Sequence, residues 1–309
     1  MLDTQSYKIH GIQNLEFFAR QVVEGFITGL HRSPYHGFSV EFAEHRQYNQ
    51  GESTRHIDWK LYGRTDKLFL KRFEEETNLR AQLILDVSGS MYYPKVKELT
   101  PQNLNKIGFS VMASAVLMDL LKRQRDAVGL SLVDDSLRWT APAKGSAAHH
   151  RMLLAHLEEA LVPPQKELRG TRLVEQLHLL AEKFPKRSMV MLFSDMLDRV
   201  EEEDALFEAF QHLRYNKHEL ILFHTFDAPT ERDFDLGNRP LKLVDLETGE
   251  KIKLDPEDYR ELYHEKMEER FRSLKLKCGQ YGIDFMEADI SKGFETVLLP
   301  FLLKRQKLF

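Results

Sequence analysis

The chain has 309 residues, of which 42% are hydrophobic and 30% are charged, and its formal net charge is -4. This composition is typical of a globular protein, and the acidic balance excludes a bulk electrostatic attraction to nucleic acid or to an acidic membrane surface. Its single cysteine, Cys278, excludes an internal disulfide and fits a reducing compartment. No apolar run approaches the roughly 20 residues that span a bilayer, and the first residues lack the basic and apolar segments of a secretory signal. We therefore expect a cytoplasmic protein that does not insert into membranes.

The first predicted element is an amphipathic helix from about Leu15 to Leu30, because its apolar residues recur at helical spacing. Residues 36–80 follow, with dense mixed charges and aromatic side chains but no helical periodicity. Such a density of charge is most often a solvated surface, although Trp59 could equally belong to a packed cluster or to a partner-binding face. We expect residues 1–78 to form a smaller N-terminal region with some β-structure. Residues 36–80 would brace the sheet or provide a second interaction surface.

From Leu79 onward, predicted strands and helices alternate. We expect buried strands over 83–87, 128–133, 188–193, 220–225 and 283–286, and helices over 100–125, 147–161, 173–184, 200–215, 255–278 and 294–301. Thr100 and Pro101 are a suitable N-cap and first residue for the first of these helices. Asp134-Asp135 predicts a hairpin turn onto an edge strand at 137–140. This alternation implies an α/β domain over residues 79–309, with a doubly wound, mainly parallel, Rossmann-type sheet and a hairpin insertion near 241–254.

An aspartate and two serines at alternate positions follow the first buried strand of this domain. The apolar run 83–85 leads into Asp86, and Ser88 and Ser90 come next. Side chains at the carboxyl end of a parallel strand point to the place where open α/β sheets bind their ligands. Three oxygen donors from one turn suit a hard divalent cation such as Mg²⁺. Turn chemistry alone also favours Asp, Ser and Gly after a strand, so a simple turn is the alternative interpretation.

Two further residues can complete such a site. Thr171 follows a glycine in the loop that opens a helix, and Asp195 ends the apolar strand from Met189 to Phe193. If these strand ends are neighbours, the residues brought together are Asp86, Ser88, Ser90, Thr171 and Asp195. This arrangement resembles the metal-ion-dependent adhesion site of von Willebrand factor A-type domains. The resemblance implies bound Mg²⁺ or Mn²⁺, with the three hydroxyls as direct ligands and the two carboxylates holding metal-bound water.

The resemblance extends upstream of the aspartate strand. The motifs that carry it are Gly37–Phe42, Arg46-Gln47-Tyr48, Gly51-Glu52, Arg55–Trp59 and Phe73-Glu74. Their order is similar to that in the bacterial MoxR-associated von Willebrand factor A-like proteins, the family of domain of unknown function fifty-eight. The similarity covers nearly the whole chain beyond the first helix, and it implies a MoxR-type AAA+ ATPase, or the client of that ATPase, as the partner. Two positions depart from the pattern, since Arg169 and Met196 stand where related domains commonly have glycine.

Neutral hydroxyl ligands leave a cation electron-poor and keep one water exchangeable, so that an Asp or Glu of a partner can replace it. We therefore expect a non-enzymatic, metal-dependent protein-interaction module that acts as an adaptor or co-chaperone. One alternative is a phosphoryl-transfer or hydrolytic enzyme that uses Asp86 or Asp195, but the chain has no glycine-rich phosphate loop. The other is a scaffold whose metal site has lapsed, as the departures at Arg169 and Met196 suggest.

Overall fold

The computed structural model describes residues 12–31, 45–47, 59–66, 68–71, 79–163, 172–196, 203–245 and 249–306. The chain forms two compact units, one of Met1–Ile27 with Leu79–Phe309 and the other of Thr28–Asn78. In the smaller unit, β1 (His45–Gln47) pairs antiparallel with β2 (Phe69–Lys71), and α2 spans Trp59–Thr65. Most of residues 36–80 lie outside the described residues, so the bracing or partner-binding role of this region stays a prediction.

The larger unit is built on one six-stranded sheet. The strands in spatial order are β10 (Asp284–Asp289), β7 (Glu219–Phe226), β6 (Met189–Ser194), β3 (Arg80–Asp86), β4 (Ala127–Val133) and β5 (Leu137–Lys144). Neighbouring strands are parallel except β5, which pairs antiparallel with β4 at the sheet edge. The predicted α/β class with a mainly parallel sheet is therefore confirmed, and so is the hairpin onto an edge strand.

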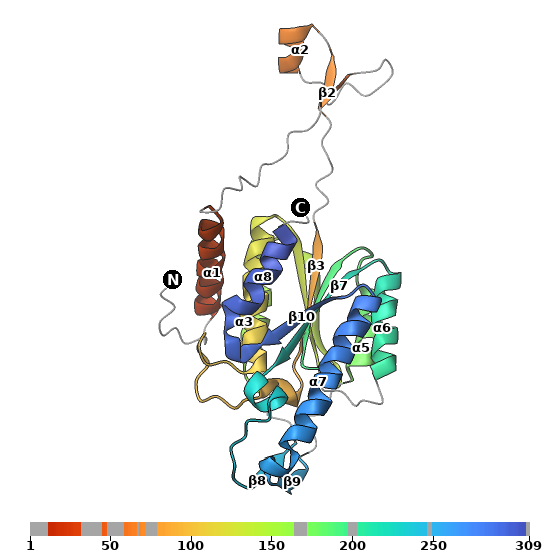
Figure 1. Ribbon diagram of the computed structural model, residues 1–309. Coiled ribbons are helices and arrows are strands. Elements are labelled where there is room, and N and C mark those ends of the chain that lie inside the picture. Colours follow the sequence, from red (N-terminus) through yellow and green to blue (C-terminus); the bar gives the residue numbers. More distant parts are fainter. Residues whose placement is uncertain are drawn as a thin grey trace. The chain divides into compact units, whose positions relative to one another are not determined.

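The sheet is buried on both faces, which explains why its strands are continuous apolar runs. In β3, Leu83 and Leu85 belong to one hydrophobic core and Ile84 to the other. The first core is covered by α1 (Ile12–His31), α3 (Lys106–Arg123), α4 (Ala147–Glu159) and α8 (Phe294–Gln306), and the second by α5 (Leu173–Lys183), α6 (Glu203–Tyr215) and α7 (Pro256–Gln280) (Figure 1). The sheet thus has a layer of helices on each face. No helix in the described ranges has both the length and the apolar character needed to cross a membrane.

Helix α1 packs against the first core, although its sequence was grouped with the N-terminal region. Leu15, Phe18 and Val23 are buried, and the ring of Phe18 meets that of Phe294 edge-on, with 5.7 Å between ring centroids. An apolar stripe at helical spacing has to be covered by another element. For this reason residues 1–27 form one unit with residues 79–309, and a boundary at residue 78 does not separate the first helix from the sheet.

Helix α3 begins later than the sequence pattern predicts. Its N-cap is Asn105, whose side-chain oxygen accepts the N–H of Gly108 at 2.8 Å. Thr100, the expected N-cap, instead exchanges two backbone hydrogen bonds with Asn103. Thr and Asn are both favourable N-caps, so local preference does not distinguish them. Lys106 consequently becomes the first residue of a helix that is buried on almost every side.

A two-stranded ribbon, β8 (Leu241–Val244) with β9 (Lys251–Leu254), stands between β7 and α7 in the chain, where the hairpin insertion was expected. The strands are antiparallel and pair Leu241 with Leu254. Asp255 ends the ribbon and caps α7, because its side chain accepts the N–H of Glu257 at 3.3 Å.

Gly129 in β4 lies where neighbouring strands leave no space for a side chain. A Cβ at this position would collide with the side-chain oxygen of Gln82 and lie 2.6 Å from the carbonyl oxygen of Ala141. We expect Gly129→Ala to lower the free energy of unfolding by about 1–3 kcal/mol, because the backbone at Ala141 has to move. Urea denaturation measures this loss. Gly145→Ala is the control, since its Cβ would meet only the carbonyl oxygen of Asp126, at 3.8 Å; equal midpoints for the two variants would contradict the prediction.

Candidate functional site

The strand order reverses between β3 and β6. From β3 the chain moves outward through β4 to β5, and it then returns to the other side of β3 with β6, β7 and β10. In open α/β sheets, ligands bind at the carboxyl ends of the strands at such a point. Asp86 is the last residue of β3, and Asp195 directly follows β6. Both candidate carboxylates therefore come from the position where this fold places its binding sites.

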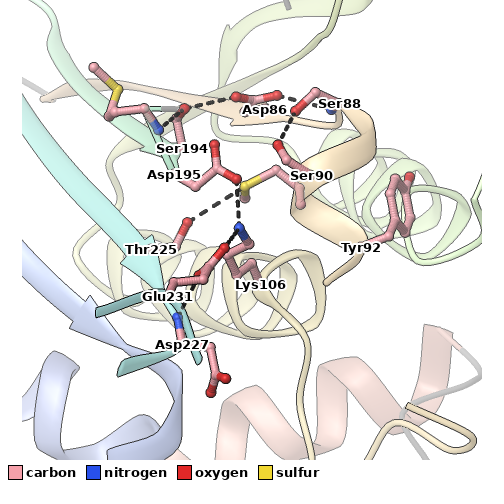
Figure 2. A network of polar contacts seen from close by, with 12 residues as sticks. Asp86, Ser88, Ser90, Tyr92, Lys106, Ser194, Asp195, Thr225, Asp227 and Glu231 are labelled. Carbon is pink, nitrogen blue, oxygen red and sulfur yellow. Dashed lines mark hydrogen bonds and ion pairs between the residues drawn. The ribbon is translucent and has the colours of Figure 1, made fainter. Parts of the chain in front are cut away.

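The carboxylate of Asp86 is held in one orientation by its neighbours. Its Oδ1 accepts the backbone N–H of Ser88 at 2.9 Å, and its Oδ2 accepts the hydroxyl of Ser194 at 2.8 Å. Beyond it, Ser88 Oγ and Ser90 Oγ lie 3.1 Å apart at the turn η2 (Gly89–Tyr92). Figure 2 shows these side chains gathered with Asp195. The structure thus brings together four of the five residues that the sequence singled out.

The fifth residue, Thr171, lies outside the described residues, as does Arg169. Their contribution to the site stays a prediction. The next described residue, Arg172, donates its backbone N–H to the carbonyl oxygen of Asp134 at 3.1 Å. This bond fixes the end of the loop beside the turn that joins β4 to β5.

Met196 lies at the position where the resemblance to von Willebrand factor A-type domains implies a glycine, and its backbone conformation fits that expectation. Its φ of 52° lies in the left-handed region, which costs a residue with a Cβ about 1–2 kcal/mol. The buried Met196 side chain packs in the second core, and its carbonyl oxygen accepts a hydrogen bond from Arg270 at 2.6 Å. These contacts offset the backbone strain, so the departure from glycine is compatible with the turn.

A buried lysine that the sequence analysis did not identify also contacts the site. Lys106 is fully buried, and its Nζ lies 2.7 Å from Asp195 Oδ2 and 2.5 Å from Glu231 Oε1 (Figure 2). Glu231 comes from η4 (Ala228–Arg232), the turn after β7, and its second oxygen accepts the N–H of Asp227 at 2.8 Å. A buried ammonium requires such partners, because an unpaired buried charge costs several kcal/mol.

One signal in the sequence points to Lys106. It is the only charged residue between Glu98 and Asp119, in a stretch whose other residues are those of a buried helix. Glu231 carries no comparable signal, because it lies in a polar stretch that reads as an ordinary surface turn. Ser194, which immediately precedes Asp195, also belongs to no sequence motif that would indicate its hydrogen bond to Asp86.

The charges of the site are unbalanced. Burial and the charge of Asp195 raise the pKa of Asp86 to about 6. Burial by itself would lower the pKa of Lys106, but the carboxylates of Asp195 and Glu231 raise it above its ordinary value, so the ammonium stays protonated. With all four groups ionised, their three carboxylates and one ammonium sum to a charge of -2. Arg270, which donates to the carbonyl oxygen of Met196, brings a further positive charge to this end of the site, so the negative excess that a bound cation would balance is smaller than this sum.

The oxygen donors also have a spacing that fits a small cation. Mg²⁺ binds oxygen octahedrally at about 2.1 Å, which places adjacent ligand oxygens about 3 Å apart. Ser88 Oγ and Ser90 Oγ are hydrogen-bonded to each other at 3.1 Å, a separation that two adjacent ligands of Mg²⁺ would also have. Among the described residues, no group of three or more His, Cys, Asp and Glu side chains is suited to hold a metal ion. A metal site among these residues would therefore need the serine hydroxyls as ligands.

His224 supports the site from the side of β7. Its Nε2 lies 3.0 Å from the carbonyl oxygen of Asp195, and burial lowers its pKa to about 4. The ring is consequently neutral at pH 7, and its Nε2–H donates to that carbonyl. This bond fixes the backbone that presents the Asp195 carboxylate.

The chain matches one protein family model and several uncharacterised proteins. A family model described as "Protein of unknown function DUF58" matches residues 44–272. Uncharacterized protein Rv1480 of Mycobacterium tuberculosis and Uncharacterized protein Mb1516 of Mycobacterium bovis are each 22% identical over 249 residues, which cover 79% of this chain and 73% of the relative. The crystal structure of conserved hypothetical protein BatB from Bacteroides thetaiotaomicron is 14% identical, covers 69% of this chain and 93% of that chain, and has a TM-score of 0.41. That score is too low to support a conclusion about this chain.

Lys106→Met removes the ammonium that pairs with the buried carboxylates of Asp195 and Glu231. We expect the free energy of unfolding, measured by urea denaturation in EDTA, to fall by about 3–5 kcal/mol. Lys122→Met on the same helix is the control; the lysine side chain is 38% exposed, and we expect a loss of at most about 1 kcal/mol. The double variant Lys106→Met/Asp195→Asn should recover part of the loss. No recovery would mean that packing, and not charge, causes the destabilisation.

Asp86→Asn keeps the shape of the side chain and removes its charge. Because the pKa of Asp86 is raised from 3.8 to about 6 in the folded protein, the ionised carboxylate destabilises the fold above pH 6, and this cost vanishes below the unfolded value. In EDTA we therefore expect Asp86→Asn to raise the free energy of unfolding by up to about 3 kcal/mol at pH 7 and to have little effect near pH 4. Denaturation curves at both pH values test this, and a pH-independent effect would contradict it.

Proposed function

The chain belongs to the DUF58 family, whose function is unknown, and we propose from the geometry of its site that it is a non-enzymatic protein-interaction module. Its larger unit acts as a von Willebrand factor A-like domain that binds Mg²⁺ or Mn²⁺. Through this cation the protein holds an acidic side chain of a partner.

The observation that carries this proposal is the pair of serine hydroxyls beside buried carboxylates. Ser88 Oγ and Ser90 Oγ lie 3.1 Å apart, next to Asp86, whose raised pKa reflects burial and the charge of Asp195. Neutral oxygens at ligand spacing, in surroundings with excess negative charge, form an environment that a hard divalent cation stabilises.

Each side chain has a distinct role in this site. Ser88 and Ser90 would provide direct oxygen ligands, and the resemblance to adhesion sites adds Thr171 as a third. Asp86 and Asp195 would accept hydrogen bonds from water on the cation, with Asp86 oriented by Ser194. The bound cation supplies a coordination position with exchangeable water, which an Asp or Glu carboxylate of a partner can occupy.

The family resemblance suggests the identity of the partner. We expect a MoxR-type AAA+ ATPase, or the client on which it acts, to provide the acidic side chain. In this role the protein is an adaptor or co-chaperone that connects the ATPase with its client.

Lys106 favours a second candidate function. Its ammonium already neutralises part of the charge at Asp195, as a cation bound there would. The chain would then be a scaffold that binds its partner without metal, with Lys106 as a permanent positive charge inside the site.

Isothermal titration with MgCl₂ and MnCl₂ separates the two candidates. The metal-dependent module should bind one cation, and Ser88→Ala should weaken that binding at least about tenfold by removing a ligand. Ser273→Ala, in the middle of α7, is the matched control and should leave the affinity unchanged. Absence of binding in the unsubstituted protein would favour the scaffold.

A pull-down with a purified MoxR-type ATPase then tests the use of the cation. We expect the complex to form in Mg²⁺, to dissociate in EDTA and to be lost in Asp195→Ala, with Ser273→Ala again as the control. A complex that survives both EDTA and Asp195→Ala would remove the proposed mechanism.

A further inference from the structure

Three lysines project from one face of the β8–β9 ribbon. Lys242 lies directly opposite Lys253, and Val244 lies opposite Lys251. Residues that oppose each other in an antiparallel pair point to the same side, and residues two apart in a strand do so as well. Lys242, Lys251 and Lys253 therefore share one face, and all three are exposed.

This placement is unfavourable for the isolated protein. Like charges directly opposite each other destabilise a β-ribbon, and no ion pair joins any of the three lysines to a residue in the described part of the chain. The cluster also runs against the balance of the whole chain, whose net charge is -4. An acidic partner would remove the repulsion.

The ribbon also offers backbone and apolar surface. It has only two strands, and no third strand pairs with either edge within the described residues. Ile252 is 63% exposed, and Val244, on the lysine face, is 46% exposed. An exposed strand edge with apolar side chains can accept an added strand from another protein.

The base of the ribbon is fixed beside the candidate metal site. Arg260 Nη2 donates to the carbonyl oxygen of Gly237 at 3.2 Å, and the hydroxyl of Tyr263 donates to the carbonyl oxygen of Glu231 at 2.9 Å. The ring of Phe234 stacks on that of Tyr263 at 4.3 Å. Figure 1 shows the ribbon beyond the end of the sheet at which β3 leads into the site. A partner held at the site is thus within reach of the ribbon.

We propose that the β8–β9 ribbon is a docking surface for an acidic, extended segment of a partner protein. The segment lies along the free edge of β9 and presents carboxylates at alternate positions to Lys251 and Lys253. Alternate side chains of any strand are about 7 Å apart, so the spacing of the two lysines matches that of an alternating acidic sequence. Docking of this kind does not depend on the cation. It can therefore be tested separately from the proposed metal-dependent binding of an acidic side chain.

Fluorescence anisotropy with a labelled ten-residue peptide of alternating Glu and Val tests this proposal. All measurements contain EDTA, so that the metal site does not contribute. The peptide should bind the unsubstituted protein, and a peptide with Gln in place of Glu should bind at least about tenfold more weakly. Lys242→Gln/Lys251→Gln/Lys253→Gln should likewise weaken binding of the acidic peptide at least about tenfold. Lys183→Gln/Lys186→Gln/Lys217→Gln, at the opposite end of the sheet and with the same change in charge, should have less than about a twofold effect.

Both triple variants should keep the melting temperature of the parent, since the six lysines are exposed. Three results would overturn the proposal. The first is acidic-peptide binding that is equal in the two triple variants. The second is tighter ribbon-dependent binding to phosphatidylserine vesicles or to a single-stranded oligonucleotide than to the peptide. The third is self-association, in sedimentation experiments, that requires the three lysines, because the occupant would then be a second copy of this chain.

Discussion

The buried ammonium of Lys106 is the interaction on which the arrangement of the site depends. It joins three segments that are distant in sequence: the start of α3, the end of β6 at Asp195, and the turn after β7 at Glu231. Each of the three charges would be costly to bury alone, so none of these segments can shift without exposing the others to that cost. The oxygen donors at the end of β3 therefore lie beside three segments that the ion pairs of Lys106 hold in fixed positions.

The ion pairs of Lys106 also determine the electrostatics of the site. Lys106 balances only part of the charge of the neighbouring carboxylates, and burial together with the charge of Asp195 raises the pKa of Asp86. In the proposed function, a cation bound here would experience both the remaining negative charge and the repulsion of the internal ammonium. Its affinity would then be moderate and sensitive to a partner's carboxylate, which suits reversible contact better than permanent retention of the ion.

The sequence predicts those features that depend on local pattern. Apolar runs identified the strands of the sheet, and the order of strands and helices gave its doubly wound form. Asp86, Ser88 and Ser90 were recognisable because one short turn carries all three. Lys106 and Glu231 are separated by 125 residues, and no local pattern encodes a contact over that distance. The start of α3 was misplaced because Thr100 and Asn105 are both good caps, and only the tertiary structure selects between them.

The packing of α1 has a consequence for how the chain matures. Phe18 contacts Phe294, and Phe294 in turn contacts Phe109, with ring centroids 5.9 Å apart. The first core is thus closed by α1 and α8, which lie far apart in the sequence, and closure cannot finish until α8 has left the ribosome. The opposite core draws on residues that begin with β3 and can assemble without α1. During synthesis the apolar face of α1 can pack on α3 but is not covered by α8 until the end, so part of this face stays exposed to aggregation until then.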